Sequence, residues 1–254
     1  MESNGNSDIT YVTTYYNEPE LLEALLENFV TEFFTKIIIV DDASQKYPAE
    51  PIVRKYADTL PITLLRAKHD LGFNSHGCRN LAMQHVETEW AYLTDIDIYT
   101  DFNASFDLYN AVKVSELKQY FTFWRGLKQD YIGRCEECYN DFCIRVKDFW
   151  ESYGYDEEYT GIHYGDKIYQ QKLNSYMVRT VLPNIIIDKR GSRKSTMTSD
   201  VDITSYDNEN GTMLHPYISQ QTMKKINDKV GYRNETRELW PTKSVVDFEW
   251  EKVL

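Results

Sequence analysis

The first hundred residues alternate between two hydrophobic patterns, and this alternation constrains the fold more than any other feature of the chain. Short runs rich in β-branched and aromatic residues are typical of strands, and they occupy residues 9–16, 36–41, 62–65 and 91–94. Segments with a helical apolar stripe or helix-start signals lie between them, at residues 19–29, 47–58 and 75–86. Strands that alternate with helices through short connections predict a mostly parallel sheet with helices on both faces.

The pattern is less regular after Asp97. We expect helices over residues 114–119 and 164–173, and strands over residues 120–124, 142–146 and 178–187, the last interrupted by Pro183. A helix ending near Gly154 is expected to follow the second of these strands. Residues 190–211 are polar and rich in Gly, Ser, Asp and Asn, which predicts a flexible loop. The sequence therefore favours one compact α/β domain with a smaller subregion after residue 100.

Composition and charge narrow the class of protein. Hydrophobic residues make up 42% of the 254 residues, as in globular proteins. The net charge is −12 and no basic stripe is present, which disfavours nucleic acid as a partner. No apolar segment follows a basic start, and no apolar run is long enough to cross a bilayer. We therefore expect a cytoplasmic protein whose four cysteines are reduced.

Three of these cysteines lie close together in the sequence. Cys135, Cys138 and Cys143 could bind zinc with a fourth ligand such as His163. No second paired motif accompanies them, so the pattern favours ordinary thiols.

Acidic residues follow three of the expected strands. Glu18 follows the first strand, Asp41 and Asp42 the second, and Asp95 and Asp97 the fourth. Ligands of open parallel sheets bind at the carboxyl ends of the strands, so these acids are expected to share one edge. Acids gathered there would repel one another unless a cation or a hydrogen-bond donor lies among them. The pattern therefore predicts a site for a hard divalent ion, which prefers oxygen ligands.

These motifs, taken together, resemble the inverting family 2 glycosyltransferases with the GT-A fold. The resemblance covers roughly the first two thirds of the chain and rests on five ordered pieces: residues 15–18, 38–44, 71–82, 92–97 and 154–166. It implies a Rossmann-like sheet in which residues 1–100 bind a nucleotide sugar. It also implies that residues 101–254 bind the acceptor and supply a flexible C-terminal lid.

The resemblance implies a role for particular residues of the first half. Thr13, Tyr15 and Glu18 would lie at the nucleoside pocket of a donor with a uracil base, and Asp41 or Asp42 would accept a hydrogen bond from that base. Arg79 would reach toward the donor. Asp95 would bind the ribose and the metal, and Asp97 the metal. The divalent cation would be Mn²⁺ or Mg²⁺, with His215 as a third ligand carried by the lid.

The resemblance also places the catalytic base. Asp166 stands at the family position, although the usual acidic pair is here Gly165-Asp166. An inverting transfer needs a base to take the proton of the attacking acceptor hydroxyl, and a carboxylate on a separate downstream element suits this task. Asp156, Glu157 and Glu158 are the neighbouring alternatives. The expected reaction is sugar transfer from a UDP-linked donor to a hydroxyl of a saccharide or glycoconjugate.

Other activities fit the sequence less well. A haloacid-dehalogenase-type phosphatase would carry Asp-x-Asp on its first strand, and a nucleotidyltransferase would need a Gly-rich basic loop in place of residues 17–19. A catalytically silent protein that binds carbohydrate or nucleotide sugar on the same fold remains the main alternative. Glycosylation of a nucleic-acid base is the second alternative, which the acidic charge disfavours.

Overall fold

The computed structural model describes residues 8–72, 74–116, 118–127, 135–138, 140–157, 165–188, 206–207, 212–213 and 246–254. The helices are α1 (Pro19–Glu27), the 3-10 helix η1 (Thr31–Phe33), α2 (Glu50–Val53), α3 (Ser75–Gln84), α4 (Phe102–Lys113), α5 (Val146–Glu151) and α6 (Gly165–Asn174). The strands of the central sheet are β1 (Ile9–Tyr15), β2 (Lys36–Asp41), β3 (Ile62–Ala67), β4 (Trp90–Asp95), β5 (Ile98–Tyr99), β6 (Gln119–Leu127), β7 (Cys135–Glu137), β8 (Phe142–Arg145), β9 (Val178–Asp188) and β12 (Trp250–Lys252). A separate pair consists of β10 (Tyr206–Asp207) and β11 (Thr212–Met213).

The central sheet has a parallel half and a mixed half. Its strand order is β12-β3-β2-β1-β4-β8-β6-β9-β5, with β7 paired to β6. Strands β3, β2, β1 and β4 are parallel, as the alternation of the first hundred residues predicts. Beyond β4, β8 is antiparallel to both β4 and β6, whereas β6 and β9 are parallel. The carboxyl ends of β1, β2, β4 and β6 therefore lie at one edge.

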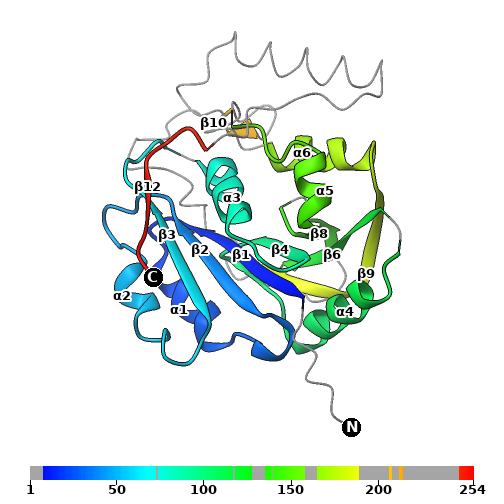
Figure 1. The fold of residues 1–254 in the computed structure, drawn as a ribbon, viewed down its shortest axis with the longest axis horizontal. Helices are drawn as coiled ribbons and strands as arrows, with labels where there is room; N and C mark the ends of the chain where they lie inside the picture. The colour runs from blue at the N-terminus through cyan, green and yellow to red at the C-terminus, as the bar shows by residue number, and fades with distance from the viewer. Residues whose placement is uncertain are drawn as a thin grey trace.

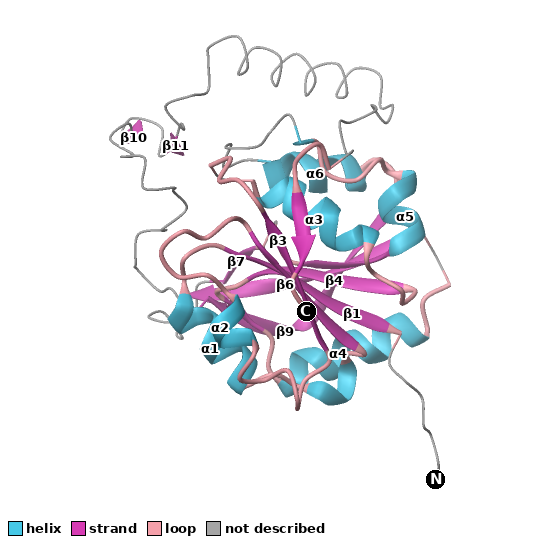
Figure 2. Cartoon of the chain, turned by 60° about the vertical axis from the view of Figure 1, so that its left-hand side comes forward, coloured by secondary structure: helices cyan, strands magenta, loops and turns pink. Residues whose placement is uncertain are grey.

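Helices cover both faces of this sheet, each over its own hydrophobic core. Helices α3, α5 and α6 lie on one face, and α1, α2 and α4 lie on the other (Figures 1 and 2). Alternate residues of each strand enter the two cores: Val12, Leu93 and Tyr120 pack on the α3 side, whereas Tyr11 and Tyr92 pack on the α1 side. We name these the α3 face and the α1 face. Burial on both faces explains why the central strands read as continuous apolar runs.

Three expectations for local structure are corrected. Residues 114–119 are not a helix: α4 ends at Lys113 and β6 begins at Gln119. The regular part of the helix expected over residues 47–58 is only α2, Glu50–Val53. Strand β9 is not interrupted by Pro183, because the register between β6 and β9 shifts there, from Thr122↔Val181 to Trp124↔Ile185. The irregularity accommodates a residue that has no N–H to donate to a ladder.

The remaining expectations concern membrane spans and the C-terminal segment. Within the part of the chain that the structure describes, no helix is both long and apolar enough to cross a membrane. The flexible loop expected over residues 190–211 and the C-terminal lid that would carry His215 lie almost entirely outside the described residues.

Candidate active site

The ends of β1 and β2 are fixed to each other by backbone and side-chain hydrogen bonds. Asn17 adopts a positive φ of 51°, a conformation that Asn tolerates, and its Oδ1 accepts hydrogen bonds from the backbone N–H groups of Lys46 and Tyr47. The backbone N–H of Asn17 donates to the Ser44 hydroxyl. The loops that follow the two strands therefore form one rigid unit at the carboxyl edge.

The two adjacent aspartates of this unit have different environments. Asp41 accepts hydrogen bonds from the backbone N–H groups of Ser44 and Ala49, each at 2.8 Å, so both of its oxygens hold the loop. Asp42 accepts one from the backbone N–H of Asn74 at 2.9 Å. Among the described residues its Oδ1 is buried without a hydrogen-bond partner, and burial raises the pKa of Asp42 to about 7. Of the two aspartates, Asp42 is therefore the one with an oxygen that holds no part of the loop.

The other residues expected at the nucleoside pocket lie on β1 and just beyond it. Thr13 is fully buried within the sheet, and Tyr15 is 1% exposed with its hydroxyl donating to the Tyr47 carbonyl at 2.6 Å. Glu18 is half-buried and immediately precedes α1. The structure thus brings all three to the same edge as Asp41 and Asp42, but Thr13 and Tyr15 do not face solvent.

At the end of β4, two donors hold Asp95. The guanidinium of Arg79, from α3, donates to Asp95 Oδ1 at 2.5 Å. The side-chain amide of Asn140 donates to Asp95 Oδ2, and the Arg79 guanidinium also donates to the Asn140 carbonyl at 3.3 Å. The Asp95 side chain keeps 23% of its surface exposed, so it can still meet a ligand.

Arg79 also joins Asp95 to the expected catalytic base. Its other terminal nitrogen donates to Asp166, at the start of α6, and to the Tyr155 hydroxyl at 2.9 Å. The Arg79 side chain is completely buried, whereas Asp166 is 16% exposed. Burial alone would lower the pKa of Arg79, but Asp166, Tyr155 and Asp95 raise it. The arginine is thus a fixed positive charge that links two carboxylates from distant parts of the chain.

Asp97 is a buried acid two residues beyond the end of β4, and its charge acts on the buried Tyr11. It is 1% exposed, and its charge, together with those of Asp141 and Asp95, adds to burial in raising the pKa of Tyr11. Asp141 is completely buried, accepts a hydrogen bond from Tyr92, and has a pKa raised by burial to about 7. Two buried carboxyl groups in one low-dielectric region disfavour each other's negative charge, which a nearby cation would offset.

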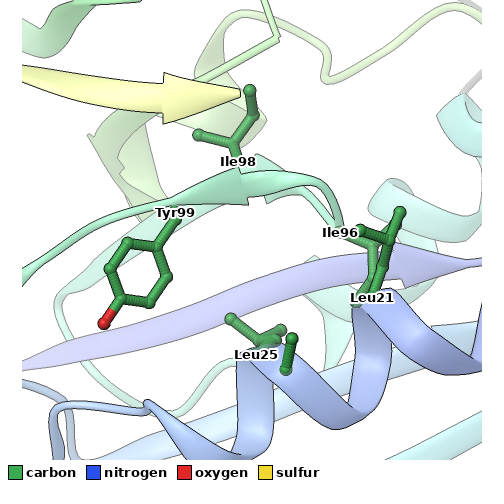
Figure 3. A pocket seen from close by; sticks show the side chains of 6 residues that line it. Leu21, Leu25, Ile96, Ile98 and Tyr99 are labelled. Carbon is green, nitrogen blue, oxygen red and sulfur yellow. The ribbon is translucent and has the colours of Figure 1, made fainter. Parts of the chain in front are cut away.

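The residue between the two aspartates of Asp95-Ile96-Asp97 anchors this loop. Ile96 lines a small apolar pocket with Leu21 and Leu25 of α1, together with Ile98 and Tyr99 (Figure 3). The pocket is on the α1 face, away from Arg79. Packing of Ile96 against α1 therefore fixes the turn that carries the two carboxylates on either side of it.

The oxygen ligands at the end of β4 suit Mg²⁺ or Mn²⁺, but they do not complete a metal site. Within the described ranges, no three His, Cys, Asp or Glu side chains are grouped so that they could hold a metal ion. Asp95 and Asp97 would need further ligands from the donor's phosphates or from elsewhere. His215, the expected third ligand, and His163 lie outside the described residues. Cys138 and Cys143 are buried free thiols.

Reasoning from the sequence gave no role to three contributors to this site, although one of them, Tyr155, lies within the last piece of the resemblance. Asn140, Asp141 and Tyr155 come from segments of irregular pattern, and their partners are 45, 49 and 76 residues away in the chain. The tripeptide Tyr139-Asn140-Asp141 precedes an expected strand, and polar residues at that position were the only available signal.

Comparison with known proteins relates the chain to glycosyltransferases. Residues 10–124 match the sequence model of the family described as glycosyl transferase family 2. Over 93 residues, 35% of the chain, the sequence is 31% identical to the hyaluronan synthase of Pasteurella multocida. The matched part is 9% of that enzyme, so the chain corresponds to a small part of this relative.

Similar solved structures are also glycosyltransferases. The mannosyltransferase PcManGT of Pyrobaculum calidifontis, in complex with GDP-Man and Mn²⁺, has a TM-score of 0.57 and 19% identity, over 75% of this chain and 59% of its own. TarS of S. aureus has a TM-score of 0.55 and 15% identity, over 70% and 34%. GalNAc-T7 with UDP, GalNAc and Mn²⁺ has a TM-score of 0.54 and 11% identity, over 71% and 42%. The fold is therefore that of the GT-A glycosyltransferases, and residues 10–124 resemble glycosyl transferase family 2.

Proposed function

We propose that the protein is a metal-dependent, inverting glycosyltransferase that moves a sugar from a UDP-linked donor to a hydroxyl of a saccharide or glycoconjugate. The observation that carries this proposal is the link Asp95–Arg79–Asp166 at the carboxyl edge of the sheet. It joins a carboxylate at the end of β4 to a carboxylate on a separate helix, inside a domain whose sequence matches family 2. The chain spans only part of the length of its relatives.

In this proposal the donor lies across the ends of β2, β1 and β4. Asp42 accepts a hydrogen bond from the uracil N3–H through its available oxygen, and the rigid loops after β1 and β2 hold the nucleoside. The guanidinium of Arg79 is the positive charge next to the departing diphosphate. UDP is proposed as the leaving group because the resemblance to family 2 implies a uracil base, and the complexes of GalNAc-T7 with UDP and of TarS with UDP-GlcNAc support it.

Asp95 and Asp97 would hold the divalent ion. When bound, this ion would neutralise the negative charge that develops on the leaving diphosphate. The complexes of PcManGT and GalNAc-T7 contain Mn²⁺, which supports a cation of this kind here. In the described residues Arg79 is the positive charge that contacts Asp95.

Asp166 is the proposed base. It is partly exposed at the amino-terminal end of α6, and its partners Arg79 and Tyr155 fix its position without closing it to solvent. A carboxylate held in this way can take the proton of an acceptor hydroxyl as the bond to the sugar forms. The two aspartates proposed for the nucleobase take their hydrogen bonds from the backbone of Ser44, Ala49 and Asn74, so nucleoside binding does not depend on Asp166.

The experiment that tests this function measures release of UDP from UDP-glucose, UDP-N-acetylglucosamine, UDP-galactose and UDP-glucuronic acid. Each donor is incubated with the purified protein in Mn²⁺, in Mg²⁺ and in excess chelator. We expect hydrolysis of at least one donor with a divalent ion and loss of that hydrolysis in chelator. A protein that binds a donor but never hydrolyses it would be the silent binding protein instead, and GDP-mannose hydrolysis alone would overturn the choice of UDP.

A further inference from the structure

Three exposed apolar side chains gather on neighbouring strands of the mixed half of the sheet. Trp124 of β6 is 39% exposed, and Val181 and Ile185 of β9 are 38% and 48% exposed. Trp124 and Ile185 are directly paired, and Val181 is paired with Thr122. We name these three residues the Trp124 surface. Exposed apolar residues that adjoin one another mark binding surfaces more often than scattered ones do.

The strand register places this surface level with the end of β4. Leu93 of β4 pairs with Phe142 of β8, and Cys143 pairs with Phe121 of β6. One step along, Thr122 lies opposite Phe142 and is therefore level with Leu93.

Trp124 and Asp95 each lie two residues beyond these level positions. They are therefore level with each other and on the same face as Leu93, the α3 face. The shift in register near Pro183 adds residues to β9 alone, so the alternation along β6 is kept. The segment that carries β7 and β8 lies between them: the pairs of β4 with β8 end at Leu93, and Trp124 itself pairs with Glu137 of β7.

Helix α6 connects the Trp124 surface to the proposed base. Its carboxyl end, at Asn174, accepts a hydrogen bond from Tyr120 at the start of β6, at 2.5 Å. In its middle, Gln170 donates to the carbonyl of Cys138, the residue after Glu137, which pairs with Trp124. The amino end of α6, with Asp166, therefore lies over the same face and toward the same edge.

The position of the surface distinguishes acceptor from donor. The residues proposed for the nucleoside lie on β2 and β1, on the opposite side of β4 from β6. A donor that runs from β2 to β4 places its sugar at Asp95, and the next ligand along the sheet is then the acceptor. The chemistry of a sugar ring suits this surface. A pyranose has an apolar C–H face, which an indole ring can cover, and a rim of polar hydroxyl groups. Arg179, whose Nε donates to Thr122 at 3.1 Å, provides polar groups beside the apolar floor.

From these observations we propose that the Trp124 surface is the floor of the acceptor subsite, on which one sugar ring of a saccharide acceptor stacks against the Trp124 indole. This inference rests on the proposed function, because it assigns the acceptor of that same reaction. It makes the acceptor a saccharide with an unsubstituted ring face rather than a lipid headgroup or a peptide.

The test measures binding of cellotetraose, chitotetraose and a hyaluronan tetrasaccharide by calorimetry, in the presence of UDP and Mn²⁺. We expect at least one to bind the unaltered protein, and Trp124→Ala to weaken that binding about tenfold or more, with a much smaller change for UDP. Trp124→Phe keeps a ring and should lose about two- to fourfold. It should also abolish the change in tryptophan fluorescence that the saccharide produces, which places the sugar on this ring.

The matched control is Phe102→Ala. Phe102 is 54% exposed on α4, over the α1 face, and its removal should leave saccharide binding as it is. Equal saccharide binding by Trp124→Ala and the unaltered protein would overturn the proposal. So would a larger loss of UDP binding than of saccharide binding, which would move the surface to the donor site. Donor hydrolysis without binding of any of the three saccharides would leave the surface to another occupant, such as a protein or a segment of this chain.

The two proposals fail in different ways. If no donor is hydrolysed and UDP does not bind, the proposed transferase function is wrong. If a saccharide nevertheless changes the fluorescence of Trp124, the protein is a carbohydrate-binding protein. If donors are hydrolysed but Trp124→Ala changes nothing, only the acceptor subsite is wrong.

Discussion

The two sides of the site hold their carboxylates in different ways. At the ends of β1 and β2, backbone N–H groups from nearby loops hold Asp41 and Asp42. At the end of β4, the side chains of Arg79 and Asn140 hold Asp95, and Arg79 also holds Asp166. Backbone donors are fixed by the path of the chain, whereas side-chain donors can change rotamer. The nucleobase side, with Asp41 and Asp42, is therefore preformed. The transfer side, with Asp95 and Asp166, can exchange hydrogen-bond partners when a donor binds.

The largest effect is expected for Asp97→Ala on the transfer side. The variant should abolish transfer and metal-dependent donor binding, because half of the carboxylate pair is lost. The free protein should be no less stable than the unaltered one, since one of several neighbouring buried acids is removed. Turnover with Mn²⁺ and thermal unfolding measure the two effects. The control is Asp58→Ala at an exposed position, and near-normal turnover of Asp97→Ala would remove Asp97 from the site.

The next effect is expected for Asp166→Asn. Asn keeps the size and much of the hydrogen bonding but cannot take a proton, so kcat should fall by about 10²–10⁴ with donor affinity nearly unchanged. Asp156→Asn is the matched control, a buried neighbouring carboxyl that should leave kcat within a few-fold. Joint loss of UDP affinity and turnover would instead place Asp166 on the donor side.

Arg79→Lys tests whether the transfer side depends on a forked donor. A lysine keeps the charge but cannot reach Asp95, Asp166 and Tyr155 at once, so we expect a loss of about 1–3 kcal/mol in the free energy of unfolding. Urea denaturation measures it. The exposed pair Arg54–Glu50 offers the control: Arg54→Lys should change stability by less than about 0.5 kcal/mol. Equal effects at the two positions would show that Arg79 is an ordinary ion-pair partner.

A smaller effect separates the two adjacent aspartates of the preformed side. Asp42→Ala should weaken UDP binding about tenfold, the loss of a hydrogen bond to a charged acceptor, with a modest change in stability. Asp41→Ala should do the reverse, because its two backbone N–H partners are left buried. Calorimetry with UDP and thermal unfolding measure the pair. Weak UDP binding in Asp41→Ala without loss of stability would exchange the two assignments.

The last effect is a pH dependence that both sides share. Burial raises the pKa of Asp42 and of Asp141 to about 7, so the folded protein holds protons that the unfolded chain releases near pH 4. Each group therefore costs stability as pH rises from about 4 to about 7. The stability of Asp42→Asn and of Asp141→Asn, relative to the unaltered protein, should rise across this range by roughly 4 kcal/mol each, since one pKa unit corresponds to about 1.4 kcal/mol. Urea unfolding at pH 5 and pH 8 measures it, and a difference that does not change with pH would contradict the raised pKa.

The sequence by itself determined the parallel half of the fold and the edge where the acids meet. Strand runs such as residues 36–41 are apolar on both faces, and a run of this kind is stable only between two layers of helices. The carboxyl ends of parallel strands share an edge, so Asp41, Asp42 and Asp95 could be brought together without coordinates. These patterns repeat every two to four residues within a single strand or helix. They can therefore be recognised in the sequence alone.

Only the tertiary structure decided which groups hold those acids. Arg79 meets Asp166 across 87 residues, and Asn140 meets Asp95 across 45, through hydrogen bonds that leave no periodic trace in the sequence. The level of Trp124 with Asp95 likewise depends on the register of β8 between β4 and β6. Side-chain periodicity gives the face of a residue within its own strand, but a shift of register between strands is fixed by packing and turns. The sequence could therefore supply the carboxylates, while the fold supplied their partners.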